Sequence, residues 1–168
     1  AASGVILPGV GAFDAAMKDL RESSLETVID QVIAMNKPLL GICLGMQQFF
    51  YSSEEGVEKG LDILPGSCKK FKFSAPFKLK VPQMGWNRLI IKRPCPILEG
   101  IESGTMFYFV HSYYAVPEDE TIVSAVTDYG IDFASVVHKE NIYGVQFHPE
   151  KSGEAGLKIL RNFVELCK

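Results

Sequence analysis

The sequence lacks the patterns that mark disulfide-linked, membrane-spanning or nucleic-acid-binding proteins. Four cysteines and three histidines are scattered over 168 residues, and no two cysteines form a C-x-x-C pair. No apolar run approaches the ~20 residues that a membrane helix needs. With 17 basic and 20 acidic side chains the net charge is −3, so the excess of positive charge typical of nucleic-acid binders is missing. We therefore expect reduced thiols, a cytoplasmic location, no metal site, and neither a membrane nor a nucleic acid as partner.

Length and composition fit one ordinary folded domain. Hydrophobic side chains make up 47% of the sequence and charged side chains 22%, close to the average of globular proteins. No repeat, low-complexity segment or change of composition divides the chain. We therefore expect residues 1–168 to form a single domain with one continuous fold.

The first part of the sequence alternates short apolar runs with segments of helical periodicity. The run at 5–7 ends at Pro8 and predicts a buried strand, and the run at 39–42 predicts a second. Asp14 is placed to cap the first of three expected helices. Strands that alternate with helices are typically parallel and joined by right-handed crossovers. The expected helices cover 14–23, 25–35 and 44–51.

The second part changes to short strands and turns before one last helix. That helix is expected over 153–166 with Ser152 as its N-cap. The pattern predicts an α/β fold, an open, mostly parallel sheet flanked by helices with an added antiparallel β region. The expected strands cover 67–73, 87–91, 106–114, 122–126, 134–137 and 142–147. The apolar face of the helix is expected to contain Leu157, Leu160, Phe163, Val164 and Cys167.

Cys43 is the candidate nucleophile. It stands between an apolar strand and a helix, with Gly41 two residues before it and Gly45 two residues after. This is the spacing of a nucleophile elbow, a tight turn whose neighbours must be small. A helix beginning at Leu44 would direct its N-terminus at the sulfur and lower the pKa of the thiol. A buried structural cysteine is the plainer interpretation, but a strand interior gains nothing from two glycines.

His148 and Glu150 are the candidate base and its orienting carboxylate. They follow a strand, and residues two apart on an extended chain point to the same side. Glu150 would bind one ring nitrogen of His148 and leave the other free to take the proton of Cys43. His111, which follows an apolar run, is the competing base. A surface histidine and glutamate in a turn is the alternative interpretation.

A glycine-containing turn and a glutamine complete the candidate site. Gly9, Val10 and Gly11 follow the first expected strand, and open α/β sheets bind ligands at this end of their strands. The turn lacks the further glycine and the Lys-Ser/Thr ending of a phosphate loop, and a plain turn without a binding role is the alternative interpretation. Gln47 lies four residues after Cys43, so on a helix it faces the same side. It could bind the polar end of a substrate, or lie neutrally on a helix surface.

Three segments together resemble class I, triad-type glutamine amidotransferase domains. They are P-G-V-G-A-F at 8–13, G-I-C-L-G-M-Q at 41–47 and V-Q-F-H-P-E-K-S at 145–152. P-Q-M-G-W-N at 82–87 and Y-F-V-H-S-Y at 108–113 further resemble the family members that work in histidine biosynthesis. The resemblance covers essentially the whole chain. It implies a cysteine-dependent glutaminase that converts L-glutamine to glutamate and ammonia without a metal or organic cofactor.

The resemblance also implies a partner, a separate (β/α)₈ cyclase subunit that forms a heterodimer with this chain and receives the ammonia through a tunnel. Cys43 would be the nucleophile, His148 the general base and acid, and Glu150 the orienting residue. Residues of the Gly9–Gly11 turn and the amide of Leu44 would form the oxyanion hole and hold glutamine. The pocket would be completed by Gln47, His111, Ser112 and Tyr113. Met84, Trp86 and Asn87 would lie towards the partner.

The sequence departs from the family pattern in two places. The family usually has histidine where this chain has Gln83. The chain also starts A-A-S-G and runs at once into an apolar segment, whereas the family begins with a strand, a helix and a further strand. We therefore expect an N-terminally truncated domain with an exposed apolar sheet edge. Alternatives are another class I glutaminase, a cysteine hydrolase on the same scaffold, or an inactive fragment that keeps only a docking surface.

Overall fold

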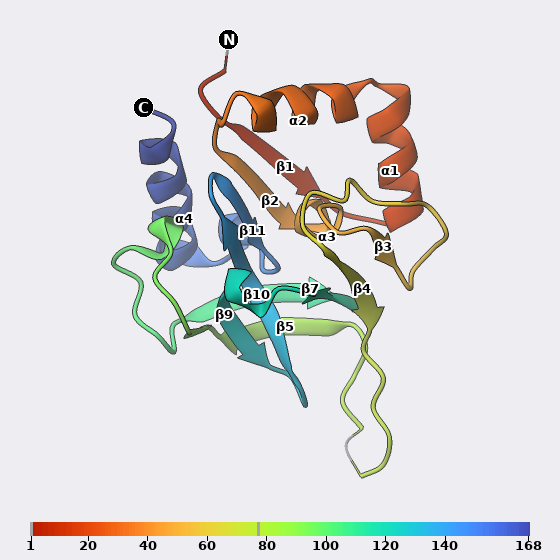
Figure 1. Ribbon diagram of the computed structural model, residues 1–168. Coiled ribbons are helices and arrows are strands. Elements are labelled where there is room, and N and C mark those ends of the chain that lie inside the picture. Colours follow the sequence, from red (N-terminus) through yellow and green to blue (C-terminus); the bar gives the residue numbers. More distant parts are fainter. Residues whose placement is uncertain (1, 77) are drawn as a thin grey trace.

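A six-stranded sheet forms the centre of the computed structural model, which describes residues 2–76 and 78–168. Its strand order is β1-β2-β11-β10-β9-β6 (Figure 1). β1 pairs with β2, and β2 with β11, in parallel, whereas the other three pairings are antiparallel. The sheet is therefore mixed, not mostly parallel, because the hairpins of the second part join it directly. The strands are β1 (Val5–Gly9), β2 (Leu39–Cys43), β6 (Ile90–Ile91), β9 (Val123–Asp128), β10 (Asp132–Lys139) and β11 (Ile142–Val145).

Helices cover both faces of this sheet. Side chains alternate along β2, so Leu39 packs with α1 and α2 while Leu40 and Ile42 pack with α4 on the other side. In Figure 1 α4 accordingly lies on the opposite side of the sheet from α1 and α2. All five residues of β2 are buried, which explains its uninterrupted apolar sequence. The helices are α1 (Phe13–Glu22), α2 (Leu25–Ala34), α3 (Leu44–Gln47) and α4 (Gly153–Leu166).

Two smaller sheets pack against the central one. A three-stranded sheet has the order β3-β4-β8, and an antiparallel ribbon pairs β5 with β7 in the register Gln83↔His111. Each ends close to the carboxyl end of β2, where the nucleophile candidate lies. These two sheets thus supply the walls of the candidate site. The strands are β3 (Ser52–Ser53), β4 (Gly66–Lys70), β5 (Gln83–Arg88), β7 (Met106–His111) and β8 (Tyr113–Pro117).

Several predicted elements differ from those observed. β1 is an edge strand with Ile6 42% exposed, whereas a buried strand was predicted from its apolar sequence. α3 ends at Gln47 rather than near residue 51, because the chain then turns into β3. α4 has the predicted bounds, but Leu157 and Val164 are exposed and only Phe163 of the predicted apolar face is fully buried. Gly156 and Ile159 are the other buried positions of this helix.

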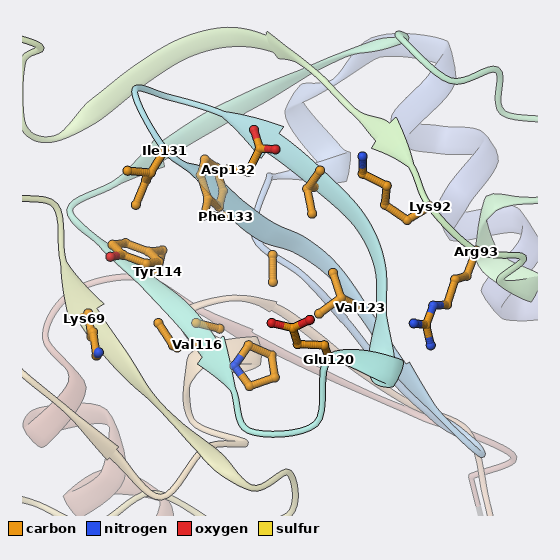
Figure 2. A pocket seen from close by; sticks show the side chains of 14 residues that line it. Lys69, Lys92, Arg93, Tyr114, Val116, Glu120, Val123, Ile131, Asp132 and Phe133 are labelled. Atoms are coloured by element: carbon orange, nitrogen blue, oxygen red, sulfur yellow. The ribbon is translucent and has the colours of Figure 1, made fainter. Parts of the chain in front are cut away.

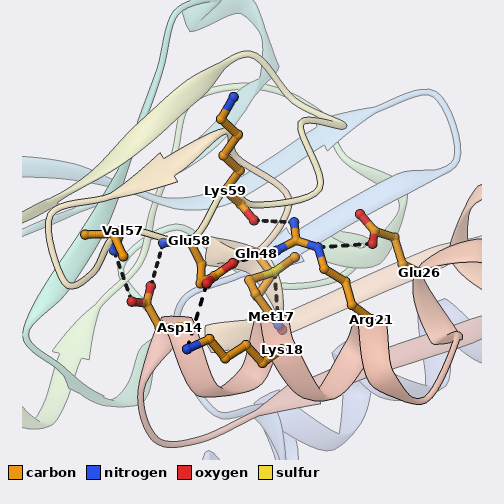
Figure 3. Close-up of polar contacts among 9 residues, drawn as sticks. All are labelled: Asp14, Met17, Lys18, Arg21, Glu26, Gln48, Val57, Glu58 and Lys59. Atoms are coloured by element: carbon orange, nitrogen blue, oxygen red, sulfur yellow. Dashed lines mark hydrogen bonds and ion pairs between the residues drawn. The ribbon is translucent and has the colours of Figure 1, made fainter.

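Asp14 does not cap α1, as the sequence predicted, but joins the helix to the loop before β4. The N-cap is Ala12, and the Asp14 carboxylate instead accepts hydrogen bonds of 3.0 Å from the amides of Val57 and Glu58 (Figure 3). These bonds lower the pKa of Asp14. Arg21, further along α1, donates to the Glu58 carboxylate at 3.0 Å. The loop that leads to the candidate site is therefore held against α1.

Candidate functional site

Cys43 occupies a strained turn between β2 and α3, as the elbow pattern predicted. Its φ of 53° and ψ of −109° are rare for a residue with a side chain. A Cβ on Gly45 would collide with the carbonyl oxygen of Leu7, and one on Gly41 would lie 2.7 Å from the Phe49 ring. The two glycines are therefore required because neighbouring chain segments approach the turn closely.

The thiol of Cys43 is buried, with only 7% of the residue exposed. Its Sγ lies 3.9 Å from the carbonyl oxygen of Val110 and 3.7 Å from the side-chain nitrogen of Gln146. Burial raises the pKa of Cys43 to about 11, and hydrogen bonds from the Leu44 amide and from Gln146 offset only part of this rise. The predicted lowering of this pKa is therefore wrong, since loss of hydration outweighs the field of a four-residue helix.

His148 and Glu150 form a close pair just after β11. The Nδ1 of His148 lies 2.7 Å from Oε1 of Glu150. A 3₁₀ turn over Pro149–Lys151 brings them together, not the extended chain that was predicted. The carboxylate fixes Nδ1 as the protonated nitrogen, and Nε2 is buried without a hydrogen-bond partner among the described residues. The free nitrogen is thus available to accept a proton.

A cavity of about 370 Å³ brings most of the predicted site residues together. Gly9 and Glu150 do not line it: Gly9 packs beneath the elbow against Leu44, and Glu150 lies behind His148. Cys43 and His148 share the wall of this cavity, so a ligand in it would meet both. The predicted residues that line it are Val10, Gly11, Cys43, Leu44, Gln47, His111, Ser112, Tyr113 and His148.

His111 lines the same cavity but does not suit the role of competing base. Its Nδ1 lies 2.7 Å from the carbonyl oxygen of Tyr113, which can only accept, so a neutral ring carries its proton there. Its Nε2 lies 2.8 Å from the side-chain amide of Gln83, which must therefore turn its NH₂ group towards the ring. Burial lowers the pKa of His111 to about 4, so its ring is neutral near pH 7. With both nitrogens occupied, His111 shapes the pocket wall and Gln83 holds its ring.

Two residues with polar contacts in the site were not predicted from the sequence as site residues. Gln146, fully buried, accepts from Gln47 at 3.1 Å and donates to the Cys43 sulfur. Glu55 lines the cavity, and its carboxylate accepts from the Phe13 amide at 2.9 Å. Glu55 lies in a run of charged loop residues and carries no sequence signal of its own. Gln146 lies within the V-Q-F-H-P-E segment that resembles the family, but only the spatial approach of β11 to β2 gives it a role.

A second cavity, of about 670 Å³, lies between β8 and the β9–β10 hairpin (Figure 2). It has an apolar floor that includes Tyr114 and Phe133, and charged side chains such as Lys69, Arg93 and Glu120 surround it. None of the predicted catalytic residues lies in it. The smaller cavity at Cys43 is the better candidate, because it joins a thiol to an imidazole and the larger one does not.

The described residues contain no cluster of three or more His, Cys, Asp or Glu side chains that could hold a metal ion. In the same part of the chain, no helix is long and apolar enough to cross a membrane.

Comparison with known proteins identifies consistent relatives. The family model described as glutamine amidotransferase class-I matches residues 2–167. The imidazole glycerol phosphate synthase subunit HisH of Moorella thermoacetica is 52% identical over 169 residues, covering 100% of this chain and 79% of its own length. HisH of Archaeoglobus fulgidus is 52% identical over 168 residues, covering 99% of this chain and 81% of its own.

Solved structures share the fold at much lower sequence identity. PurLQS from Thermotoga maritima superposes with a TM-score of 0.71 at 19% identity, covering 99% of this chain and 80% of that one. A glutamine amidotransferase from the same organism gives a TM-score of 0.66 at 15% identity, covering 97% and 63%. The mixed α/β architecture is therefore shared with glutamine amidotransferase structures.

Proposed function

The chain belongs to the class I glutamine amidotransferase family and, within it, to the HisH subunits of imidazole glycerol phosphate synthase, and from this premise we propose how it hydrolyses glutamine. It is a cysteine-nucleophile glutaminase whose ammonia serves imidazole glycerol phosphate synthesis in histidine biosynthesis. The observation that carries the mechanism is the buried Nε2 of His148, which has no hydrogen-bond partner in residues 2–76 and 78–168 and lies on the same cavity wall as Cys43.

In the proposed first step His148 takes the thiol proton of Cys43, and the sulfur attacks the side-chain amide carbon of glutamine. The negative charge moves to the amide oxygen, where the Leu44 N–H and an N–H of the Gly9–Gly11 turn stabilise it. Collapse of this intermediate breaks the carbon–nitrogen bond, and His148 returns the proton to the leaving ammonia. A thioester on Cys43 and free ammonia result.

In the second step His148 removes a proton from water, which attacks the thioester. The same donors stabilise the second oxyanion. The Cys43 thiolate then leaves as glutamate forms, and His148 returns a proton to the sulfur. Glu150 accepts the hydrogen bond from Nδ1–H throughout, so that Nε2 always faces the reacting atoms. Because burial raises the pKa of Cys43 to about 11, we expect proton transfer to accompany attack rather than precede it.

The remaining polar groups of the cavity suit the amino-acid end of the substrate. Glu55 places a carboxylate on the cavity wall, where it would pair with the α-ammonium group of glutamine. Gln47, Ser112 and Tyr113 line the same cavity and would fix the rest of the ligand. Glu55 is tied to the start of α1 through the Phe13 amide, which limits its freedom to move.

We further propose that the cyclase partner, of the (β/α)₈ type, docks as a heterodimer on the face around Trp86. Met84 is 66% exposed and Trp86 53% exposed on β5, although both are large and apolar. Trp86 packs edge-on against Tyr108, whose carbonyl oxygen accepts from the His148 amide at 2.9 Å. Ammonia released at Cys43 would therefore have a short path to this face. Asn87 of the same strand, also expected to lie towards the partner, donates to the Asp128 carbonyl.

The proposal includes a cytoplasmic location, supported by four free cysteines in the described residues.

The proposed glutaminase activity is tested by measuring glutamate release from the chain mixed with its cyclase subunit, with and without the substitution Cys43→Ser. We expect the variant to lose the activity while its circular dichroism spectrum is unchanged. Glutamate release at the original rate by Cys43→Ser would contradict the proposed nucleophile.

A further inference from the structure

A line of buried amide groups connects the Tyr113 carbonyl to the sulfur of Cys43. The Nε2 of Gln47 donates to the Tyr113 carbonyl oxygen at 2.9 Å and to Oε1 of Gln146 at 3.1 Å. The Nε2 of Gln146 in turn donates to Sγ of Cys43 at 3.7 Å. Gln47 is 4% exposed and Gln146 fully buried, so water does not compete for these groups.

The orientation of both amides follows from the first member of this line. A backbone carbonyl only accepts, so Gln47 must turn its NH₂ group towards Tyr113. Its second N–H then requires an oxygen opposite it, which is Oε1 of Gln146. The NH₂ group of Gln146 consequently faces the sulfur. His111 donates to the same Tyr113 carbonyl at 2.7 Å, which fixes the start of the line further.

We propose that Gln146 is a further residue of the catalytic machinery: its amide donates to the Cys43 sulfur and stabilises the thiolate, while Gln47 acts as a positioning residue that holds Gln146 in this orientation. The inference rests on the proposed role of Cys43 as nucleophile. It assigns Gln47 a task beyond lining the glutamine pocket. A thiolate gains more from an N–H donor than a thiol does, because the hydrogen bond is then charge-assisted.

The surroundings of the sulfur explain why such a donor is needed. Burial disfavours the charged thiolate, and the carbonyl oxygen of Val110 on its other side is an acceptor that opposes negative charge. The Leu44 amide and Gln146 are the neutral groups that favour the thiolate. Gln146 is the one whose side chain can be exchanged without changing the backbone of the elbow.

Titratable groups around the sulfur come from three parts of the chain, and a Gln146→Leu substitution leaves all of them unchanged. His148 and Glu150 follow β11, with Lys151 next to them, and the charge of Glu150 disfavours the thiolate while that of Lys151 favours it. His111 faces the cavity from β7 and Glu55 from the loop before β4. A difference between wild type and Gln146→Leu therefore reports the amide and not a change in these groups.

The test measures alkylation of Cys43 by iodoacetamide without glutamine, from about pH 6 to pH 9, with the modified peptide identified by mass spectrometry. Gln146→Leu removes the donor at similar volume. Loss of one hydrogen bond to a charged group predicts about tenfold slower alkylation at each pH. A Gln146→Leu variant that melts like wild type and alkylates within about twofold of the wild-type rate would overturn the inference.

Two more variants keep the test decisive. Gln48→Leu is the matched control, since Gln48 is equally buried but its side chain contacts Met17 and not the line to Cys43, and its alkylation rate should equal that of wild type. Gln146→Glu keeps the oxygen that accepts from Gln47 and replaces the donor with an acceptor. It should alkylate at least as slowly as Gln146→Leu, and an unchanged rate would overturn the inference even where the leucine variant fails to fold.

This readout separates the inference from the proposed function. Alkylation reports the reactivity of the sulfur alone and needs no glutamine turnover. Activity retained by Cys43→Ser would defeat the proposed function without bearing on the Gln146 bond. An unchanged alkylation profile in the Gln146 variants would defeat the inference while leaving glutamine hydrolysis by Cys43 in place.

Discussion

The Nδ1 of His148 and Oε1 of Glu150 lie 2.7 Å apart, yet the two residues differ greatly in exposure. His148 is 3% exposed, whereas the Glu150 side chain is 48% exposed. The imidazole is thus held in the protein interior by a carboxylate that water also reaches. Such an arrangement fixes the ring while allowing the carboxylate to be altered without disturbing the core.

Replacing Glu150 therefore tests the orientation of the base with little risk to the fold. Glu150→Gln removes the charge that stabilises the imidazolium and fixes its tautomer, so we expect kcat for glutamine to fall by about 10²-fold or more. KM should change much less. The measurement is glutamate release in the complex with the cyclase subunit. Glu154→Gln, at an exposed position on α4, is the control and should leave kcat unchanged.

The elbow predicts a large cost for the smallest possible substitution. Gly45→Ala would drive its Cβ into the Leu7 carbonyl oxygen, so β1 or the elbow must shift. We expect a loss of about 1–3 kcal/mol in the free energy of unfolding, together with lower activity. Urea denaturation measures the free energy of unfolding. Gly104→Ala is the matched control: its Cβ has open space and only φ of +94° disfavours it, so activity should survive.

Burial of His111 predicts a loss of stability in mild acid. Its pKa in the folded state is about 4, below the ordinary value of 6.5, so the unfolded chain binds the proton more readily. The contribution of His111 to the free energy of unfolding is therefore fully present above about pH 6.5. It is lost as the pH falls towards 4, by on the order of 3 kcal/mol. Urea denaturation at pH 7 and at about pH 4.5 measures the difference.

The control for this pH dependence is a comparison of two histidine variants. His111→Gln should show a smaller change in unfolding free energy between these pH values. His138→Gln should retain the wild-type change, because His138 is partly exposed on β10 and contacts the Glu140 carbonyl. An equal pH dependence in all three proteins would show that His111 is not responsible.

The exposed apolar face on β5 predicts the position of the partner. Trp86→Ala should weaken binding of the cyclase subunit by about 2 kcal/mol or more, and Met84→Ala should also weaken it, since central aromatic and apolar anchors contribute most to such interfaces. Isothermal titration measures the affinity. Met35→Ala is the control, because Met35 is 62% exposed just after α2, away from β5. Equal loss of affinity in that variant would place the partner elsewhere.

The sequence predicted those features that depend on local chemistry. The bounds of α4 and the position of β2 followed from apolar periodicity and from proline and glycine signals. The strained turn at Cys43 was predicted because few local structures require two glycines around a cysteine. Close approach of His148 and Glu150 was also expected from their spacing, although the backbone between them is a 3₁₀ turn.

Features that depend on the environment of a residue were not predictable in this way. The direction of the Cys43 pKa shift depends on how fully the thiol is buried, which periodicity does not reveal. Glu55 reaches the cavity from a loop that Asp14 and Arg21 hold against α1 (Figure 3), a contact between segments far apart in the chain. The role of Gln146 depends on the pairing of β11 with β2, a contact between segments far apart in the chain.

Covalent labelling by a glutamine-analogue electrophile tests the central claim most directly. The account predicts modification at Cys43, blocked by L-glutamine, with no labelling of the fully buried Cys68 or of Cys167 at the end of α4. Peptide mass spectrometry of the labelled protein identifies the cysteine. Labelling of Cys68 or Cys167 in place of Cys43, or labelling that glutamine does not slow, would contradict the assignment of this cavity as the glutaminase site.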